Sequence, residues 1–323
     1  MRRNIVGIIL SLACGILVVP LVSDAQPPAH VPRIGVLSRT FPVFGFEAFE
    51  QGLRELGWVE GQTIALEVRA GERAQFPALA AELVRLQVDV MVTFSTPAAL
   101  AAQSATTTIP IVMASVSNPV ERRLVASLAR PGGNMTGVMH NPGPGFVSKQ
   151  LEMLKEAAPQ ITRVGVFWDS TLVTEMDEIH TTAQALGMTV LSADVPDQEP
   201  GKFDPTFATL TQERADALYV FPIYREAHGQ RIVEFANAHR LPTMWGDRQF
   251  VEAGGLMSYW TDLPTLRRRA AAYVDKILKG AKPGELPVER PRQFELVINL
   301  KTAQALGLTI APSVLFQADK VIR

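Results

Sequence analysis

Short, uncharged polar side chains follow several of the predicted strands in the first half of this 323-residue sequence. Hydroxyl and amide groups of this kind form hydrogen bonds without carrying a charge. Because the carboxyl ends of parallel strands meet at one edge of a sheet, we expect these groups to lie close together and to bind a small ligand. The candidate binding residues of this half are Ser38, Ser95, Thr96, Ser115, Ser117 and Asn118.

Two of these positions also have the form of helix starts. In Thr96-Pro97 we expect the threonine to be the N-cap and the proline to be the first helical residue, and Asn118-Pro119 repeats the pattern. Helix N-termini expose N–H donors and partial positive charge, so with nearby hydroxyls they can hold a carboxylate without a buried lysine or arginine. The alternative is that Thr96 and Asn118 are ordinary caps.

The predicted strand ends of the second half carry aromatic and acidic side chains instead. Aromatic rings there favour an apolar or flat wall for the ligand, and an aspartate could pair with an ammonium or accept a hydrogen bond from a hydroxyl. The alternative is that the tryptophans pack between two lobes and the aspartates cap helices. The candidates in this half are Trp168, Asp169, Tyr224, Trp245, Asp247 and Tyr259.

Groups that could perform a reaction are missing from the sequence pattern. The chain has no GxSxG, GxxxxGK[ST] or GxGxxG motif, and we expect no histidine beside a serine or an acid at a strand end. The five histidines are scattered and Cys14 is the only cysteine, so we expect no metal and no cofactor. We therefore expect ligand capture and no enzymatic activity; a secreted hydrolase is a competing interpretation.

The net charge of −1, from 31 Lys plus Arg against 32 Asp plus Glu, gives no broad attraction for nucleic acid. We accordingly expect no nucleic-acid partner. Lobes of this size, in a chain with 47% hydrophobic residues, can be stabilised by their apolar cores alone.

The elements around these residues alternate strand and helix, which predicts an α/β fold with parallel sheets. Residues 33–38, 63–68 and 89–94 are the first predicted strands, and helices are predicted between them. The same order returns about 130 residues later. The matching pairs are Arg33 and Arg163, Gly57 and Gly187, Thr63 and Thr189, Phe76 and Phe203, Asp89 and Asp216, and Ile109 and Leu241.

This repeat predicts two doubly wound parallel-sheet lobes with a hinge and a central cleft, although any α/β protein repeats strand and helix. We expect lobe 1 to comprise 31–141 plus 260–290, and lobe 2 to comprise 142–259 plus 291–323. We expect the lobes to close on the ligand by bending at glycines near the crossings between them. These glycines are Gly143, Gly145, Gly254 and Gly255.

Residues 1–25 have the order of an export signal. Arg2 and Arg3 precede an apolar run over 5–22, and small residues then lead to a cleavage point after Ala25. We expect a cleaved signal peptide and a periplasmic protein. An uncleaved membrane anchor and a lipoprotein attached at Cys14 are the alternatives.

Four longer motifs occur along the chain. They are TPAALAAQ over 96–103, SLARPGGNMTG over 127–137, EAGGLMSY over 252–259 and FELVINLKTA over 294–303. These motifs resemble those of the ABC-transporter substrate-binding proteins of the tryptophan/tyrosine type. The resemblance covers essentially the whole mature chain and implies a type I periplasmic-binding-protein fold. It also implies an exported receptor that delivers a small solute to a membrane permease with a cytoplasmic ATPase.

The chain departs from this family pattern at two positions. Many relatives carry Asp where Asn118 stands, and Gly commonly stands where Trp260 follows the Ser-Tyr pair. Both departures bear on which class of ligand binds, and neither changes the predicted fold. From the resemblance we expect a monomer that captures a carboxylate-bearing, amino-acid-like solute, aromatic ones included. A ligand-sensing receptor of the same fold, coupled to a membrane signalling protein, is the alternative.

Overall fold

The computed structural model describes residues 30–43, 45–168, 173–195, 200–222 and 226–323. The chain divides into a short N-terminal unit, Met1–Val31, and one large unit, Pro32–Arg323. The predicted signal peptide lies outside the described residues. Within the described ranges, no helix is long and apolar enough to cross a membrane.

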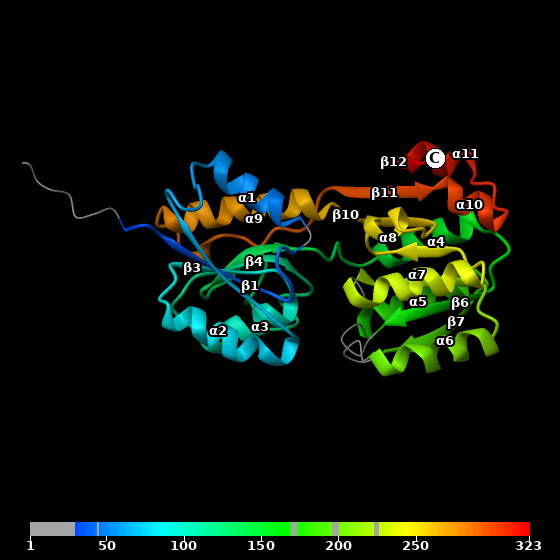
Figure 1. Ribbon diagram of the computed structural model, residues 1–323, viewed down its shortest axis with the longest axis horizontal. Coiled ribbons are helices and arrows are strands. Elements are labelled where there is room, and N and C mark those ends of the chain that lie inside the picture. Colours follow the sequence, from blue (N-terminus) through cyan, green and yellow to red (C-terminus); the bar gives the residue numbers. More distant parts are fainter. Residues whose placement is uncertain (1–29, 44, 169–172, 196–199, 223–225) are drawn as a thin grey trace, which may run out of the picture. The chain divides into compact units, whose positions relative to one another are not determined.

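The first half of the large unit forms a five-stranded sheet in which all strands are parallel (Figure 1). The strand order is β2-β1-β3-β4-β5. Every residue of β3 and β4 is buried, as expected for strands that are covered on both faces. The strands are β1 Arg33–Ser38, β2 Ala65–Ala70, β3 Val90–Thr93, β4 Ile111–Val116 and β5 Met135–Met139.

Helices cover both faces of this first sheet. On one face, Phe49 and Leu53 of α1 share a buried cluster with Leu266 and Val274 of α9. On the other face, α2 and α3 form a second cluster against the strands. The helices are α1 Phe46–Glu55, α2 Phe76–Arg85, α3 Thr96–Ala105 and α9 Leu263–Leu278, with short 3₁₀ turns at Arg73–Gln75 and Pro283–Glu285.

The second sheet has seven strands in the order β12-β11-β10-β9-β8-β6-β7. Its neighbouring strands are parallel except for the β10–β11 pair, which is antiparallel. The strands are β6 Arg163–Trp168, β7 Thr189–Asp194, β8 Ala217–Val220, β9 Thr243–Trp245, β10 Met257–Thr261, β11 Phe294–Asn299 and β12 Lys320–Ile322. The helices are α4 Phe146–Ala157, α5 Val173–Ala185, α6 Phe203–Gln212, α7 Glu226–Ala238, α8 Arg248–Glu252, α10 Leu300–Leu306 and α11 Pro312–Gln317, with a 3₁₀ turn at Pro200–Lys202.

The two sheets share one plan, which confirms the predicted fold class of two parallel-sheet lobes. The second sheet repeats the order of the first as β7-β6-β8-β9-β10 and adds β11 and β12 at its edge. Phe76 and Phe203 each begin the helix after the second strand of their sheet. Gly57 and Gly187 each have a positive φ just after a helix, at 90° and 68°.

In each sheet, an aspartate carboxylate accepts hydrogen bonds from backbone N–H groups at the start of the first strand. The Asp89 carboxylate accepts a hydrogen bond from the Arg33 N–H at 2.7 Å. The Asp216 carboxylate accepts hydrogen bonds from the N–H groups of Thr162 and Arg163, both at 2.8 Å. Both aspartates precede the third strand of their sheet, so they fasten the amino ends of the strands, opposite the edge where ligands bind in such sheets.

We expect Asp216→Asn to lower the free energy of unfolding by about 1–3 kcal/mol, because asparagine can offer only one acceptor oxygen to these donors. Urea unfolding measures the change. Asp177→Asn, at an exposed position on α5, is the control and is expected to change stability by less than about 0.5 kcal/mol. Equal stability of the two variants would contradict the clamping role.

Three connections pass between the two sheets. The segment after β5 leads to α4, whose Leu151 and Leu154 pack in the core of the second sheet. The segment after β10 leads to α9 on the first sheet, and the chain then returns to β11. Gly143 and Gly145 lie in the first of these connections, with φ values of 105° and 85°.

Gly254 and Gly255, predicted to lie near a crossing, precede β10 at its amino end and are part of the second lobe, and the crossing to α9 follows β10. A Cβ on Gly255 would come within 2.4 Å of the Trp245 Nε1 atom. The glycine is therefore required for close packing inside this lobe.

Candidate functional site

The carboxyl ends of β3 and β4 are joined by a threonine and a serine. The Thr96 hydroxyl accepts a hydrogen bond from the Ser117 N–H at 3.0 Å, and the two hydroxyl oxygens are 3.2 Å apart. The N-cap of α3 is Ser95, whose hydroxyl accepts from the Ala98 N–H at 3.3 Å. The prediction that Thr96 is the cap is wrong by one residue. Capping by Ser95 leaves the Thr96 hydroxyl available to contact the neighbouring strand.

No helix follows Asn118, so the prediction of a second helix start there is wrong. The segment after β4 is a turn in which the Asn118 carbonyl accepts from the Arg122 N–H at 3.0 Å. Asn118 has a φ of 45°, a left-handed conformation that asparagine tolerates better than most residues. The Asn118 side chain therefore caps no helix, and its amide group forms hydrogen bonds in a different cluster.

That cluster joins the two lobes through two asparagines and one glutamate. The Asn118 amide donates to Glu175 Oε1 at 3.4 Å, and the Asn141 amide donates to the same oxygen at 3.0 Å. The Asn141 amide also donates to Asn118 Oδ1 at 3.1 Å. Asn118 and Asn141 follow β4 and β5 of the first sheet, whereas Glu175 lies in the first turn of α5. Two neutral amides thus orient one carboxylate at the carboxyl ends of the strands.

The electrostatics of this cluster are set mainly by burial. Removal of water raises the pKa of the Glu175 carboxyl above its ordinary value of 4.5. Hydrogen bonds from its own backbone N–H and from Asn118 lower this pKa, as does the positive charge of Arg122. The site therefore holds a carboxylate that a cationic group on a ligand would stabilise.

The hydroxyl of Ser115 lies 3.1 Å from Nδ1 of His140, just after β5. The prediction that no histidine stands beside a serine at a strand end is therefore wrong. Ser115 lies within β4 and is only 5% exposed, so its hydroxyl is poorly placed to attack a bound carbonyl group. This hydrogen bond links the ends of two strands. Ser38 is also buried, and its hydroxyl donates to the Thr40 carbonyl at 2.6 Å.

The predicted aromatic wall of the second lobe is not formed by Trp245. This side chain is 1% exposed, stacks on Phe250 with ring centroids 4.8 Å apart, and donates its N–H to the Thr243 hydroxyl at 2.8 Å. It belongs to the core of the lobe. Trp168 is half-buried, and its N–H donates to Ser192 at 2.6 Å. Asp169 and Tyr224 lie outside the described residues.

Asp247 and Tyr259 lie near the place where β10 leads to α9. The buried Asp247 carboxylate caps α8 by accepting from the Gln249 N–H at 3.1 Å, and it also lines a small pocket. The Tyr259 ring stacks on Phe146 with centroids 5.0 Å apart. Burial raises the pKa of the Tyr259 phenol, so it is neutral at physiological pH. The predicted residues are thus divided between the strand-end cluster, this crossing and the lobe cores.

Sequence reasoning missed Asn141 and Glu175. Asn141 stands two residues after the end of β5 at Met139, a strand that the sequence analysis does not predict, although a polar residue after a strand is the signal that singles out Ser117 and Asn118. Glu175 lies inside a helix, and its position beside the asparagines depends on how the two lobes meet. A local pattern does not contain that information.

Comparisons with known proteins are consistent with this architecture. A family model for ABC transporter substrate binding proteins matches residues 45–322. A tyrosine-binding protein of Clostridioides difficile (strain R20291) is 27% identical over 268 residues, which cover 81% of this chain and 76% of the relative.

Two solved structures are similar to the chain in both fold and sequence. A conserved domain protein from Vibrio cholerae is 28% identical with a TM-score of 0.82, and the match covers 90% of this chain and 99% of that one. An ABC domain from Streptococcus pneumoniae in complex with L-Trp is 29% identical with a TM-score of 0.80, again over 90% and 99% of the two chains.

Two sheets that share one parallel strand order over five strands, with polar groups at their carboxyl ends, define a two-lobed binding protein of the type I periplasmic-binding-protein fold. The match to the family model extends over most of the chain. The chain belongs to the ABC transporter substrate-binding protein family.

Proposed function

We propose that this protein captures an L-amino acid, with aromatic side chains favoured, and delivers it to an ABC importer composed of a permease and its ATPase. The observation that carries the proposal is the cluster in which Asn118 and Asn141 of one lobe hold Glu175 of the other. The predicted signal at residues 1–25 supports export before binding, and the protein would act as a monomer in the periplasm.

The two ends of an amino acid match two parts of the site. Glu175 is a partly buried carboxylate that an ammonium group would neutralise. The hydroxyls of Thr96 and Ser117, beside the N-terminus of the ten-residue helix α3, suit a carboxylate. A ligand that contacted both would bridge the lobes, and bending at the three connections would close them around it.

Aromatic selectivity is supported by the rings near the crossing and by the relatives. The Phe146 ring contacts both the Tyr259 ring and the Trp260 ring there, and rings of this kind provide flat apolar surface. One relative is a tyrosine-binding protein, and one similar structure contains L-Trp. These names describe those proteins, and they make aromatic amino acids the first ligands to test.

Calorimetric titration of the purified chain tests the proposal with L-tryptophan, L-tyrosine and two incomplete analogues. Tryptamine lacks the carboxylate and indole-3-propionate lacks the ammonium. We expect a complete aromatic amino acid to bind, and each analogue to bind at least about tenfold more weakly because it leaves one charged or polar end unpaired. Equal binding of an analogue and its parent would contradict the two-ended site, and no binding of any amino acid would refute the proposed function.

A further inference from the structure

One hydrogen-bond cluster joins the two lobes away from the three connections between them. Glu175, on α5 of the second lobe, accepts from the Asn118 and Asn141 amides of the first lobe at 3.4 and 3.0 Å. The other hydrogen bonds between described residues that cross from lobe to lobe lie at the connections themselves. Glu175 is therefore placed to hold the carboxyl-end edges of the two sheets together.

Asn141 is the member of this cluster that also contacts a connection. Its Nδ2 donates to Glu175 Oε1 and to Asn118 Oδ1, at 3.0 and 3.1 Å, and its Oδ1 accepts from the Gly143 N–H at 2.8 Å. Gly143 lies in the connection after β5 and has a φ of 105°, which glycine adopts far more readily than other residues. One side chain thus fixes the turn of a connection and a residue of the opposite lobe at the same time.

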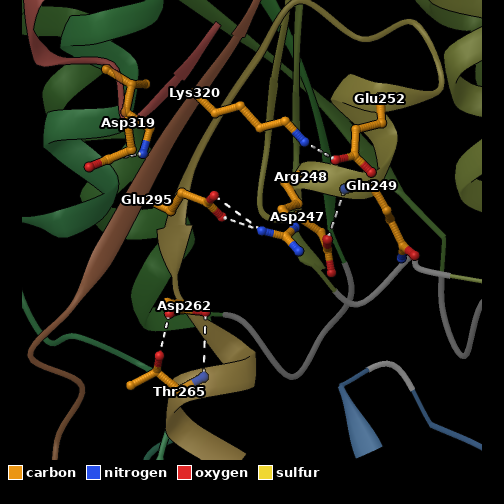
Figure 2. Close-up of polar contacts among 10 residues, drawn as sticks. Asp247, Arg248, Gln249, Glu252, Asp262, Thr265, Glu295, Asp319 and Lys320 are labelled. Atoms are coloured by element: carbon orange, nitrogen blue, oxygen red, sulfur yellow. Dashed lines mark hydrogen bonds and ion pairs between the residues drawn. The ribbon is translucent and has the colours of Figure 1, made fainter. Parts of the chain in front are cut away.

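The polar contacts near the other two connections stay within one lobe. Figure 2 shows this region, where Arg248 Nη1 donates to both carboxylate oxygens of Glu295, at 3.2 and 3.3 Å, inside the second lobe. At the start of α9 in the first lobe, the Asp262 carboxylate accepts from the N–H of Thr265 at 3.5 Å and from its hydroxyl. These contacts can persist when the lobes separate, whereas the bonds from the asparagines to Glu175 must break.

The arrangement at Glu175 is also compatible with a bound ligand. Both amides donate to the same oxygen, Oε1, so an ammonium group that approaches Oε2 need not displace either asparagine. A ligand would then add to a contact that already exists between the lobes. A protein that populates its binding-competent arrangement before the ligand arrives binds with a higher apparent affinity.

We propose that Asn141 is a positioning residue that acts through Glu175: its amide holds the two lobes together before any ligand binds. The bond to Gly143 keeps the first connection in the turn that suits this closed arrangement. The ligand-free protein is then mostly closed, and it opens when the bonds to Glu175 break. The inference goes beyond the proposed function, because it concerns the lobes alone and holds for any class of solute.

Distances between two spin labels, one on each lobe, test this inference without a ligand. The labels are attached at Ala78→Cys on α2 and Ala208→Cys on α6, two exposed helical positions. Cys14 is the only native cysteine and is replaced in a Cys14→Ser background. The chain is unfolded in urea and refolded to remove bound solute, and double electron–electron resonance then gives the populations of closed and open molecules. We expect the distance of the structure to predominate.

Three further variants separate the latch from general stability. Asn141→Ala is expected to lower the ratio of closed to open molecules about tenfold, because its hydrogen bonds to Glu175 and to the connection are lost. Glu175→Ala keeps the bond between Asn141 and Gly143 and is expected to open the lobes to a similar extent. Asn134→Ala is the matched control: the Asn134 amide donates to carbonyls within the first lobe, so the ratio should not change.

Several results would overturn the inference. A labelled, ligand-free chain found only in the open state would do so even if the variants do not fold. Unchanged distances in Asn141→Ala would exclude the latch, and equal opening in Asn134→Ala would assign the effect to the stability of the first lobe. Opening in Asn141→Ala but not in Glu175→Ala would assign it to the Gly143 turn. None of these measurements requires an amino acid to bind, so failure of the proposed function is detected separately, by the calorimetric titration.

Discussion

Glu175→Gln is expected to weaken binding of an aromatic L-amino acid by about thirtyfold, or about 2 kcal/mol. Glutamine keeps an oxygen that can accept from Asn118 and Asn141, but it loses the charge that would pair with the ammonium. Removal of one member of a buried, hydrogen-bonded charge pair costs about 2–5 kcal/mol, and we take the low end because Glu175 is only partly buried. Calorimetric titration with L-tryptophan and L-tyrosine measures the loss.

Glu178→Gln is the matched control on the same helix. Its carboxylate accepts from the N–H and hydroxyl of Ser148, both at 2.9 Å, and so contacts α4 within the second lobe. We expect its ligand affinity to stay within about twofold of the unmodified protein. Equal losses of ligand affinity in the two variants would show that affinity depends on the negative charge of α5 in general and not on the carboxylate held by the asparagines.

Because the pKa of Glu175 is raised, both the stability of the protein and its affinity for the ligand should depend on pH, each in a direction that follows from the shift. Burial raises this pKa in the folded protein, so above the ordinary value of 4.5 the folded chain holds more proton at this position than the unfolded chain. Proton binding at Glu175 therefore stabilises the folded chain most at low pH, and this stabilisation is lost as the pH rises through the pKa of the folded state. An ammonium ligand favours the ionised form, so binding releases a proton in that window and affinity increases with pH.

Titration in two buffers with different ionisation enthalpies detects the released proton. The observed binding enthalpy should differ between the buffers at mildly acidic pH, and Glu175→Gln should abolish that difference. Identical enthalpies for the unmodified protein would mean that Glu175 does not change its protonation when the ligand binds.

The fold could be predicted because its signals are local. Glycines after helices, β-branched runs and the repeated order of elements specify two similar sheets, and the aspartates at 89 and 216 perform the same task in each. Strand starts were less accurate: β2 begins at Ala65, whereas the sequence predicted residue 63. The Thr63 hydroxyl instead accepts from the Val59 N–H at 2.7 Å in the preceding turn.

The site was only partly predictable because a residue type does not specify where its side chain points. Trp245 ends a strand, as expected, but faces the lobe core, where Thr243 satisfies its N–H. The sequence singles out Trp260 for its bulk, and in the structure this side chain is buried against Phe146. The sequence predicts a helix start at Asn118, but a left-handed turn carries this residue to Glu175. Each difference depends on contacts between segments far apart in the sequence.

Gly137→Ala is expected to have the largest effect on stability, lowering the free energy of unfolding by about 4 kcal/mol or more. Gly137 has a φ of 130°, which side chains rarely adopt, and a Cβ there would lie 2.2 Å from the Met113 carbonyl oxygen. Met113 is its partner on β4, so neither backbone can move without disturbing the parallel ladder. Backbone strain and overpacking each cost about 1–3 kcal/mol, and here both act at once.

The carbonyl of Gly137 also accepts from the Glu289 N–H at 3.0 Å, so displacement of β5 would disturb the segment that returns from α9 to β11. Gly133→Ala is the control: Gly133 lies just before β5, has no positive φ, and a Cβ there meets nothing within 4 Å. We expect it to change stability by less than about 0.5 kcal/mol. Urea unfolding compares the two variants, and a Gly137→Ala protein as stable as Gly133→Ala would show that β4 and β5 are not held this closely together.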